Sequence, residues 1–202
     1  YRFPSSSELV VTPETQNVWG AVKYAGSVGE VSVFAGVSPS LTFQTFSSAS
    51  LASARTVKGK CQPALTSNDL GCSIPNMPVG NYRISVNGEF WNRVPTSGAN
   101  ECTTRIYETQ TATQIAGSLA GRNFTDSGLL HQARTIEGVF TNTSVATRNF
   151  IVQAAKVFDT TSGSAAYCAV YMNTPANGSD VTLTIEPLDN ASNSALYVQG
   201  PV

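Results

Sequence analysis

The sequence predicts an all-β fold in which two antiparallel sheets pack face to face. Short runs rich in β-branched and aromatic residues recur along the 202 residues, and clusters of Gly, Asn, Ser, Thr and Pro separate them. The chain holds 23 Ser and 22 Thr, which favour turns and strands respectively. Hydrophobic residues make up 41% of the chain, which is enough for a core, so a sandwich or barrel is expected.

The expected strands follow one another along the whole chain. Residues 47–58 fit either one helical turn or an edge segment, and a cysteine-containing loop follows them. The clearest alternation of apolar and polar residues lies at the end of the series, in "DVTLTIEPL". The expected strands are 17–24, 30–36, 40–46, 81–92, 101–109, 132–141, 148–158, 165–173 and 180–188.

The strand at 81–92 carries its apolar side chains on one face, up to a tryptophan that breaks the pattern. Tyr82, Ile84, Val86 and Phe90 alternate with polar residues and are expected in the core. Trp91 falls on the opposite face. We interpret it, with Trp19, as a candidate contact to another subunit.

The segment "RNFIVQAAKVF" (148–158) is apolar on both strand faces. A helix also fits it, but its β-branched and aromatic residues and its place among strands favour a strand. A facing sheet covers only one side of such a strand, so the other side needs a partner chain or a flanking loop. Phe150 and Val152 are therefore further candidate subunit contacts.

The charge pattern excludes several function classes. Charged residues make up only 12% of the chain, about half the usual share, and the net charge is −1. The 12 Lys and Arg are scattered, so nucleic acids and anionic membrane surfaces lack an electrostatic partner here. No apolar run approaches the ~18 residues of a membrane-spanning helix. Because the chain begins at Tyr1, we expect a fragment or a processed product.

Four cysteines are present, and they allow three disulfide pairings. Cys61 with Cys72 would close a short loop, whereas Cys102 and Cys168 lie in strand-like segments and could bridge neighbouring strands. The alternative is four buried thiols; the composition, typical of a secreted protein, favours disulfides. Without a C-x-x-C pair and with His131 as the single histidine, a zinc site is not expected.

The order of the parts resembles a known family. After the lead-in come "VWGAVKY", "SIPNMPVGNYRISVNGEF", "RIYET", "IEGVFTNTSVATRNFIVQAAK" and "SDVTLTIEPLD". This series is similar to the trimeric jelly-roll heads related to tumour necrosis factor and C1q, above all to those that tip phage tail fibres and the adhesive fibres of predatory bacteria. In such heads a "P-x-G-x-Y-x-I-x-V" segment opens the central strand, and "G-x-F-T … F-x-V-Q" and "V-x-L-x-I" segments follow.

The resemblance implies a homotrimeric jelly-roll head on an upstream stalk, and it brings no catalytic residues. It divides the chain into a lead-in (1–16), the head (17–188) and a tail (189–202). Residues 48–72 have no counterpart in it. It also implies an extracellular place, on a cell surface or a virion fibre, and recognition through apical or lateral loops.

The candidate ligand site depends on which loops share the tip of the head. If 180–188 is the last strand and runs toward the stalk, the loops 173–179 and 142–147 and the turn 109–112 lie at the tip. An extra strand at 194–199 would instead expose 93–100 and 121–128. We expect the first arrangement, with these ligand-binding residues: Thr111, Asn142, Thr143, Arg148, Asn173, Asn177 and Asp180.

Other chemistry has weaker support in the sequence. His131, Asp126 and Ser127 lie too close in sequence for a triad, which is assembled from separate elements, and no G-x-S-x-G motif is present. Asp180 and Asn177 could ligate calcium, but no D-x-D-x-D run accompanies them. No cofactor or metal is expected. The carboxylates that could serve a glycosidase are Glu89, Glu101, Glu108 and Glu137.

The sequence therefore favours a non-catalytic head that binds a glycan or another cell-envelope receptor. Exposed rings next to polar groups bind sugars, and Trp19, Trp91 and Tyr107 are candidates, although core or interface roles suit each ring as well. The alternatives are a polysaccharide-degrading tailspike-like head and a purely structural fibre cap.

Overall fold

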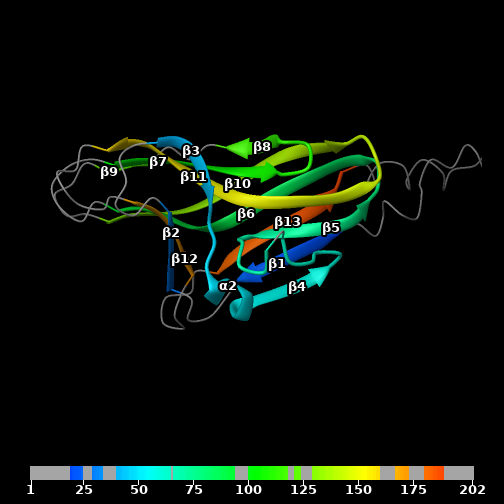
Figure 1. Ribbon diagram of the computed structural model, residues 1–202, viewed down its shortest axis with the longest axis horizontal. Helices are drawn as coiled ribbons and strands as arrows, with labels where there is room; N and C mark the ends of the chain where they lie inside the picture. The colour runs from blue at the N-terminus through cyan, green and yellow to red at the C-terminus, as the bar shows by residue number, and fades with distance from the viewer. Residues whose placement is uncertain are drawn as a thin grey trace, which may run out of the picture.

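The computed structural model describes residues 19–24, 29–33, 40–64, 66–93, 100–117, 121–123, 129–159, 167–172 and 180–188. Strands dominate these residues, and one short helix lies among them (Figure 1). The elements are β1 (Gly20–Tyr24), β2 (Gly29–Val33), β3 (Ser40–Thr45), α2 (Ala49–Ala54), β4 (Arg55–Gly59), β5 (Gly71–Met77), β6 (Gly80–Arg93), β7 (Asn100–Glu108), β8 (Thr113–Gly117), β9 (Gly121–Asn123), β10 (Leu129–Asn142), β11 (Ala146–Asp159), β12 (Tyr167–Met172) and β13 (Val181–Pro187).

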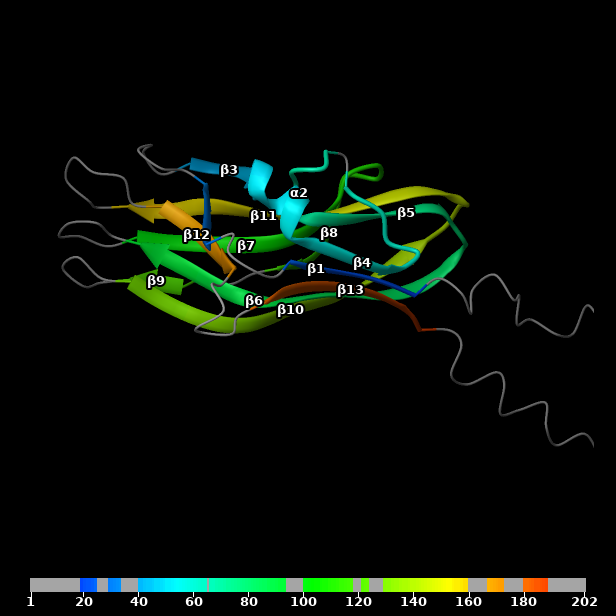
Figure 2. The ribbon, with the colours of Figure 1, turned by 90° about the horizontal axis from the view of Figure 1, so that it is seen from below.

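The strands form two antiparallel sheets, as predicted. Sheet A contains β10, β6, β12, β13, β2, β1 and β4, and sheet B contains β8, β9, β7, β11, β3 and β5. The two sheets lie over one another as layers when the molecule is turned by 90° (Figures 1 and 2). The predicted all-β, two-sheet sandwich is therefore confirmed.

Several short strands are halves of longer, interrupted strands. β12 pairs with Arg93–Glu89 of β6, and β13 pairs with Asn87–Tyr82 of the same strand in the same direction. The pairs β2 and β1, β3 and β5, and β8 and β9 likewise follow one another along a single neighbouring strand. Four such pairs together with β6, β7, β10 and β11 make eight long strands, to which β4 is added at the edge of sheet A.

The chain passes between the sheets in the order of a jelly roll. Counted as long strands, the first, third, sixth and eighth lie in sheet A, and the second, fourth, fifth and seventh lie in sheet B. Neighbours in each sheet are mostly far apart in sequence, as in β6 beside β13 and β11 beside β3. Such pairing identifies the fold as an antiparallel jelly-roll sandwich.

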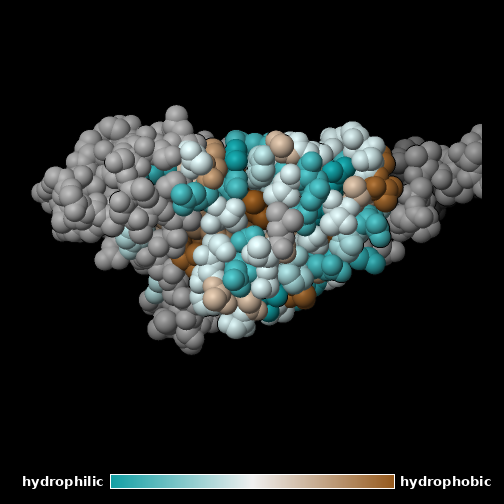
Figure 3. Space-filling view, in the orientation of Figure 1, coloured by the Kyte–Doolittle hydropathy of each residue, from teal (hydrophilic) through white to brown (hydrophobic). Residues whose placement is uncertain are grey.

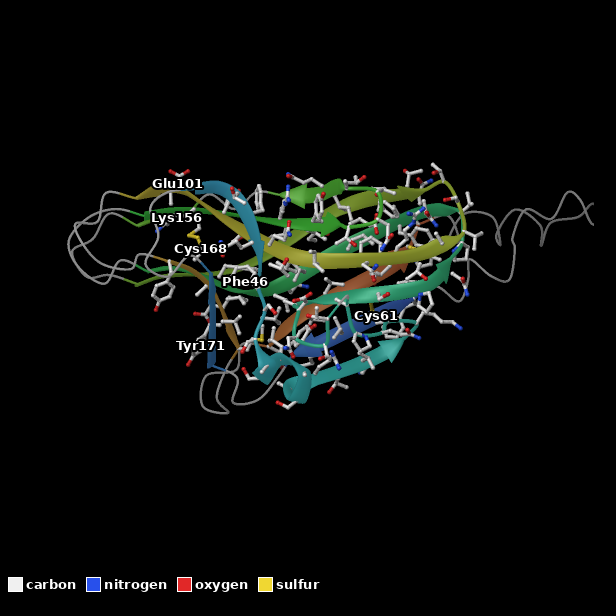
Figure 4. The ribbon with its side chains drawn as sticks, viewed as in Figure 1. Phe46, Cys61, Glu101, Lys156, Cys168 and Tyr171 are labelled. Carbon is white, nitrogen blue, oxygen red and sulfur yellow. A yellow bond between two sulfur atoms is a disulfide. The ribbon has the colours of Figure 1, made fainter. Side chains whose placement is uncertain are left out.

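The core lies between the sheets and follows the alternation predicted for β6. Tyr82, Ile84, Val86 and Phe90 are all buried. Phe46, which follows β3, packs against Phe90 with 6.3 Å between ring centroids and joins the two layers (Figure 4). The inner side chains of β13, at Val181, Leu183 and Ile185, are fully buried in the same core.

The two-faced apolar strand β11 is covered by its own chain. Phe150 and Val152 are 0% exposed inside the sandwich, so their assignment as subunit contacts is wrong. On the opposite face Ile151 is also buried, next to Gly71. The flanking segment that supplies this cover is hydrogen-bonded to β11, because Leu70 O accepts from Val152 N at 2.9 Å. The flanking-loop alternative was correct, and this strand does not point to a second subunit.

Most of the segment 48–72, which has no counterpart in the family pattern, belongs to an excursion over residues 46–70 between the two halves of one long strand. The excursion leaves after β3 and returns at β5, and it contains α2 and β4. The expectation of a helical turn or an edge segment at 47–58 is fulfilled by both elements in succession. Ser48 caps α2, since its hydroxyl accepts from Ser50 N at 3.4 Å.

The two ends of the sandwich differ in the segments that they carry. At one end lie Trp19, Leu188 and the turns at 78–80 and 142–145; Leu188 N donates to Asn81 O, and Lys60 N donates to Trp19 O. The strand ends at the opposite end are Val33, Ser40, Arg93, Asn100, Asn123, Leu129, Asp159 and Tyr167.

The predicted arrangement of loops is therefore wrong in one respect. The turns at 142–145 and 109–112 lie at the end where β1 begins and β13 finishes, the end that would face a stalk. The cause is that β12 and β13 form one interrupted strand, whereas the prediction joined them by a turn at the tip. Counting them as two strands reverses the end to which every earlier loop is assigned.

Both predicted disulfides are present. Cys61 is bonded to Cys72, and Cys102 on β7 is bonded to Cys168 on β12, which joins sheet B to sheet A (Figure 4). Disulfides of this kind are compatible with an extracellular protein. Among the described residues, no helix is long and apolar enough to cross a membrane.

Candidate functional site

Two of the predicted ligand-binding residues belong to a buried network that holds the 142–145 turn. Asn142 Nδ2 donates to Met77 O and Pro78 O, both at 2.8 Å, and Asn142 Oδ1 accepts from Arg148 Nε at 2.9 Å. Arg148 Nη2 also donates to Ser144 Oγ at 3.0 Å. Asn142 and Arg148 are 1% and 5% exposed, so the network fixes the two turns to each other and offers little surface to a ligand.

Glu108 performs a similar structural role at the turn 109–112. Its buried carboxylate accepts hydrogen bonds from Gln110 N, Thr111 N and Thr111 Oγ1 and, across the sheet, from Asn149 N. These bonds hold a turn in which Ala112 has a left-handed backbone, with φ at 54°. Such a conformation costs about 1 kcal/mol outside glycine, and the carboxylate offsets it. Thr111 is exposed, but its hydroxyl is engaged in this cap.

Thr143 and Asp180, the other predicted ligand residues that the structure describes, lie apart from each other. Thr143 is exposed on the 142–145 turn. Asp180 lies just before β13 and forms an ion pair with Lys23, 2.5 Å between Nζ and Oδ2. Asn173 and Asn177 lie outside the described residues. Within the described part of the chain, no group of three or more His, Cys, Asp or Glu residues is placed to hold a metal.

Two pairs of the candidate carboxylates are too far apart along their strands for glycosidase chemistry. Glu89 pairs with Ala133 and Glu137 pairs with Ser85, an offset of four residues, or about 13 Å. Glu101 and Glu108 are separated by seven residues of β7, about 23 Å. Paired catalytic carboxylates lie within about 10 Å of each other. For the triad, His131 pairs with Trp91 in the ladder between β10 and β6, and Asp126 and Ser127 lie outside the described residues.

The three candidate rings have different surroundings. Trp19 is 42% exposed beside Gly59, where a Cβ atom would meet Trp19 O at 2.1 Å. Trp91 lies in β6 between β10 and β12, and only its backbone is described. Tyr107 is half-buried on the outer face of sheet B, where it contacts a positively charged side chain.

That contact belongs to a cluster that spans three strands of sheet B. The Arg105 guanidinium lies over the Phe43 ring at 3.7 Å and over the Tyr107 ring at 4.2 Å. Arg105 Nε and Nη2 donate to Gln153 Oε1 at 2.9 and 2.7 Å, and Gln153 Nε2 donates to Thr45 Oγ1 at 3.2 Å. We call Phe43, Thr45, Arg105, Tyr107 and Gln153 the Arg105 platform.

The register of β3, β11 and β7 brings the side chains of the platform together on one face of sheet B. Gln153 on β11 is directly opposite Thr45 on β3 and Arg105 on β7, so a polar row crosses the sheet. Tyr107 is two residues beyond Arg105 and therefore shares its face. All five side chains are half-buried, and they stand on paired strands rather than on loops. Partial burial lowers the pKa of Arg105, although an arginine stays charged at physiological pH.

The outer face of sheet A is different, because it is polar and carries charged side chains, including Arg83 and Glu186, which form an ion pair. Thr135 donates to Asn87 Oδ1, and Thr141 Oγ1 donates to Asn81 Oδ1 at 2.8 Å. The exposed large apolar residues in the described part of the chain are Trp19 and single valines such as Val139. Figure 3 shows the other side of the molecule, that of β11, β5 and α2, and hydrophobic colour appears there only in separate spots.

The sequence interpretation included Tyr107 but missed the other four members of the platform. The pattern "RIY" already places Arg105 and Tyr107 on one face of a strand, two residues apart. Phe43 and Gln153 are 62 and 48 residues away from Arg105 in the chain, and only the strand register brings them together.

No known protein family matches the chain, and no curated protein matches its sequence. A solved structure with some similarity is Eiger TNF from S. frugiperda, which is 9% identical over 82% of this chain and 90% of that chain, with a TM-score of 0.39. The sheet order alone defines the chain as a jelly-roll sandwich.

Proposed function

We propose that this chain is a non-catalytic binding head that recognises a glycan of a cell envelope. The observation that carries the proposal is the Arg105 platform, which presents two half-buried rings and an amide on a rigid sheet face. Sugars combine apolar ring faces with hydroxyl groups, and a surface of rings next to polar side chains complements both.

The rigidity of the platform supports a binding role. Its residues belong to β3, β7 and β11, and β11 is hydrogen-bonded to neighbours on both sides. Side chains held on paired strands lose little conformational entropy when a ligand binds. The same placement suits a lateral binding surface on a displayed head.

The positions of Trp19 and Leu188 support display on a stalk. Trp19 and Leu188, near the two ends of the sandwich domain, lie at the same end of the molecule. A stalk attached there would leave the platform and the opposite end free. We propose a fibre or surface protein on this basis, in an extracellular setting that suits two disulfides.

The proposal includes a homotrimer. Its support is the low share of charged residues, 12% of the chain, because a surface poor in charge loses little solvation when a neighbouring subunit covers it. Three platforms on one axis would gain strongly in apparent affinity on a repetitive glycan.

The test is binding of the labelled full chain to isolated bacterial envelopes and to arrayed glycans. We expect retention on a subset of glycans, no release of reducing ends from them, and a trimer by light scattering. Turnover of a polysaccharide would favour the degrading alternative, and absence of binding to every glycan and envelope would favour a structural cap. A stable monomer at micromolar concentration would remove the trimer from the proposal.

A further inference from the structure

The Arg105 guanidinium carries a positive charge that no acidic side chain neutralises within the described part of the chain. The ion pairs of Lys23 with Asp180 and of Arg83 with Glu186 both lie outside the platform. Arg105 instead donates to the neutral amide of Gln153. An amide holds the guanidinium in place but leaves its charge available to a ligand.

The hydrogen-bonding capacity of Arg105 is also only partly used. A guanidinium has five N–H donors, and Gln153 Oε1 accepts from Nε and from Nη2. Nη1 has no hydrogen-bond partner among the described residues, and Nη2 retains a second N–H. Two nitrogens at the end of the fork therefore present donors in the planar geometry that matches a carboxylate.

The rings on either side fix the plane of this fork. Phe43 and Tyr107 lie 3.7 and 4.2 Å from the guanidinium carbon and are themselves half-buried. Stacking on both sides removes the rotational freedom that an exposed arginine loses when it binds an anion. The cluster is thus arranged before any ligand arrives.

We propose that the platform binds an acidic saccharide, with the sugar's carboxylate on Arg105 and its ring beside Phe43 and Tyr107. This inference rests on the proposed glycan-binding function and names the class of glycan. A single guanidinium on a chain of net charge −1 suits an anion that recurs once per sugar unit, whereas a nucleic acid requires a row of cations. The amide of Gln153 and the hydroxyl of Thr45 supply polar partners for sugar hydroxyls.

The experiment compares tetragalacturonate with its methyl ester, which has the same rings but no charge. Titration calorimetry at low salt should give an affinity for the carboxylate form at least about tenfold higher than for the ester. Arg105→Gln should abolish that preference. Arg83→Gln is the matched control, since it removes one exposed positive charge from the opposite sheet and should keep the preference.

The ligand pair tests the inference even if Arg105→Gln fails to fold. Equal affinity of the wild-type protein for the two ligands, or a preference that survives in a folded Arg105→Gln variant, would overturn the acidic-saccharide assignment. If the wild-type head binds envelopes but neither galacturonide, the proposed binding function stands and this inference fails. If it binds no envelope and no glycan, both fail.

Discussion

At the scale of single residues, the chain uses its buried polar groups to hold turns. Glu108 caps one turn, and Asn142 and Arg148 hold another. Each of these groups meets its hydrogen-bonding needs within the chain, which is the condition for burying it at tolerable cost. Polar residues at predicted loops therefore turned out to be structural when they were buried, and burial was the property that the sequence did not reveal.

Glu108→Gln should destabilise the protein by about 2 kcal/mol. The amide nitrogen that replaces one carboxylate oxygen is a donor, and in either orientation it would face a donor, Thr111 N or Asn149 N. Urea denaturation measures the free energy of unfolding. Glu137→Gln, at an exposed position of β10, serves as the control and should change it by less than about 0.5 kcal/mol. Equal effects of the two substitutions would contradict the capping role.

At the scale of elements, the excursion 46–70 is tied to both sheets. Its return into β5 is held by Tyr24 at the end of β1, whose hydroxyl accepts from Gly71 N at 3.0 Å and can donate to Asp69 O or Gly71 O at the same distance. Gly71 itself has no room for a side chain, because a Cβ atom would lie 2.4 Å from Phe150 O. The segment that interrupts a jelly-roll strand is thus built into the core.

Tyr24→Phe should cost about 1–3 kcal/mol at neutral pH, because the buried Gly71 N–H loses its acceptor. It should also change the stability at alkaline pH. Burial raises the pKa of Tyr24, although the hydrogen bond with Gly71 opposes the rise. The unfolded chain therefore releases this proton near pH 10 while the folded chain keeps it, so the wild type loses stability as the pH rises above about 10.

The phenylalanine variant lacks this proton, so its stability should fall less steeply above pH 10. Unfolding by urea, followed by fluorescence at several values between pH 8 and 11, gives both profiles. Parallel profiles for the two proteins would show that the Tyr24 hydroxyl does not contribute to the alkaline loss.

At the scale of the whole molecule, the sandwich is held by its core and by one covalent link between the sheets. Cys102–Cys168 joins β7 to β12 across 66 residues of sequence, whereas Cys61–Cys72 closes a loop across 11 residues. In the chain-entropy account, the longer loop contributes about 4 kcal/mol and the shorter about 3 kcal/mol.

Replacing Cys102 and Cys168 together by Ser should therefore lower the free energy of unfolding more than replacing Cys61 and Cys72. Both variants keep one disulfide and can be compared with the wild type in urea under non-reducing conditions. A larger loss in the Cys61/Cys72 variant would mean that the excursion, and not the link between the sheets, limits the stability of the fold.

The sequence by itself determined the fold class and most strand positions. It also offered the observed disulfides as one of three possible pairings of the four cysteines. These follow from local patterns: alternation within a strand such as 81–92, turn residues between strands, and the spacing of the cysteines. The jelly-roll order was reached through a resemblance, and the sheet order confirms it.

Only the tertiary structure decided which short strands are halves of one long strand, which segment covers β11, and which polar side chains contact each other. β12 and β13 look like two strands in the sequence, because an interruption and a tip turn have the same composition. The platform depends on a register between β3, β11 and β7, and register is a non-local property. A shift of one residue would move Gln153 to the other face and separate it from Arg105.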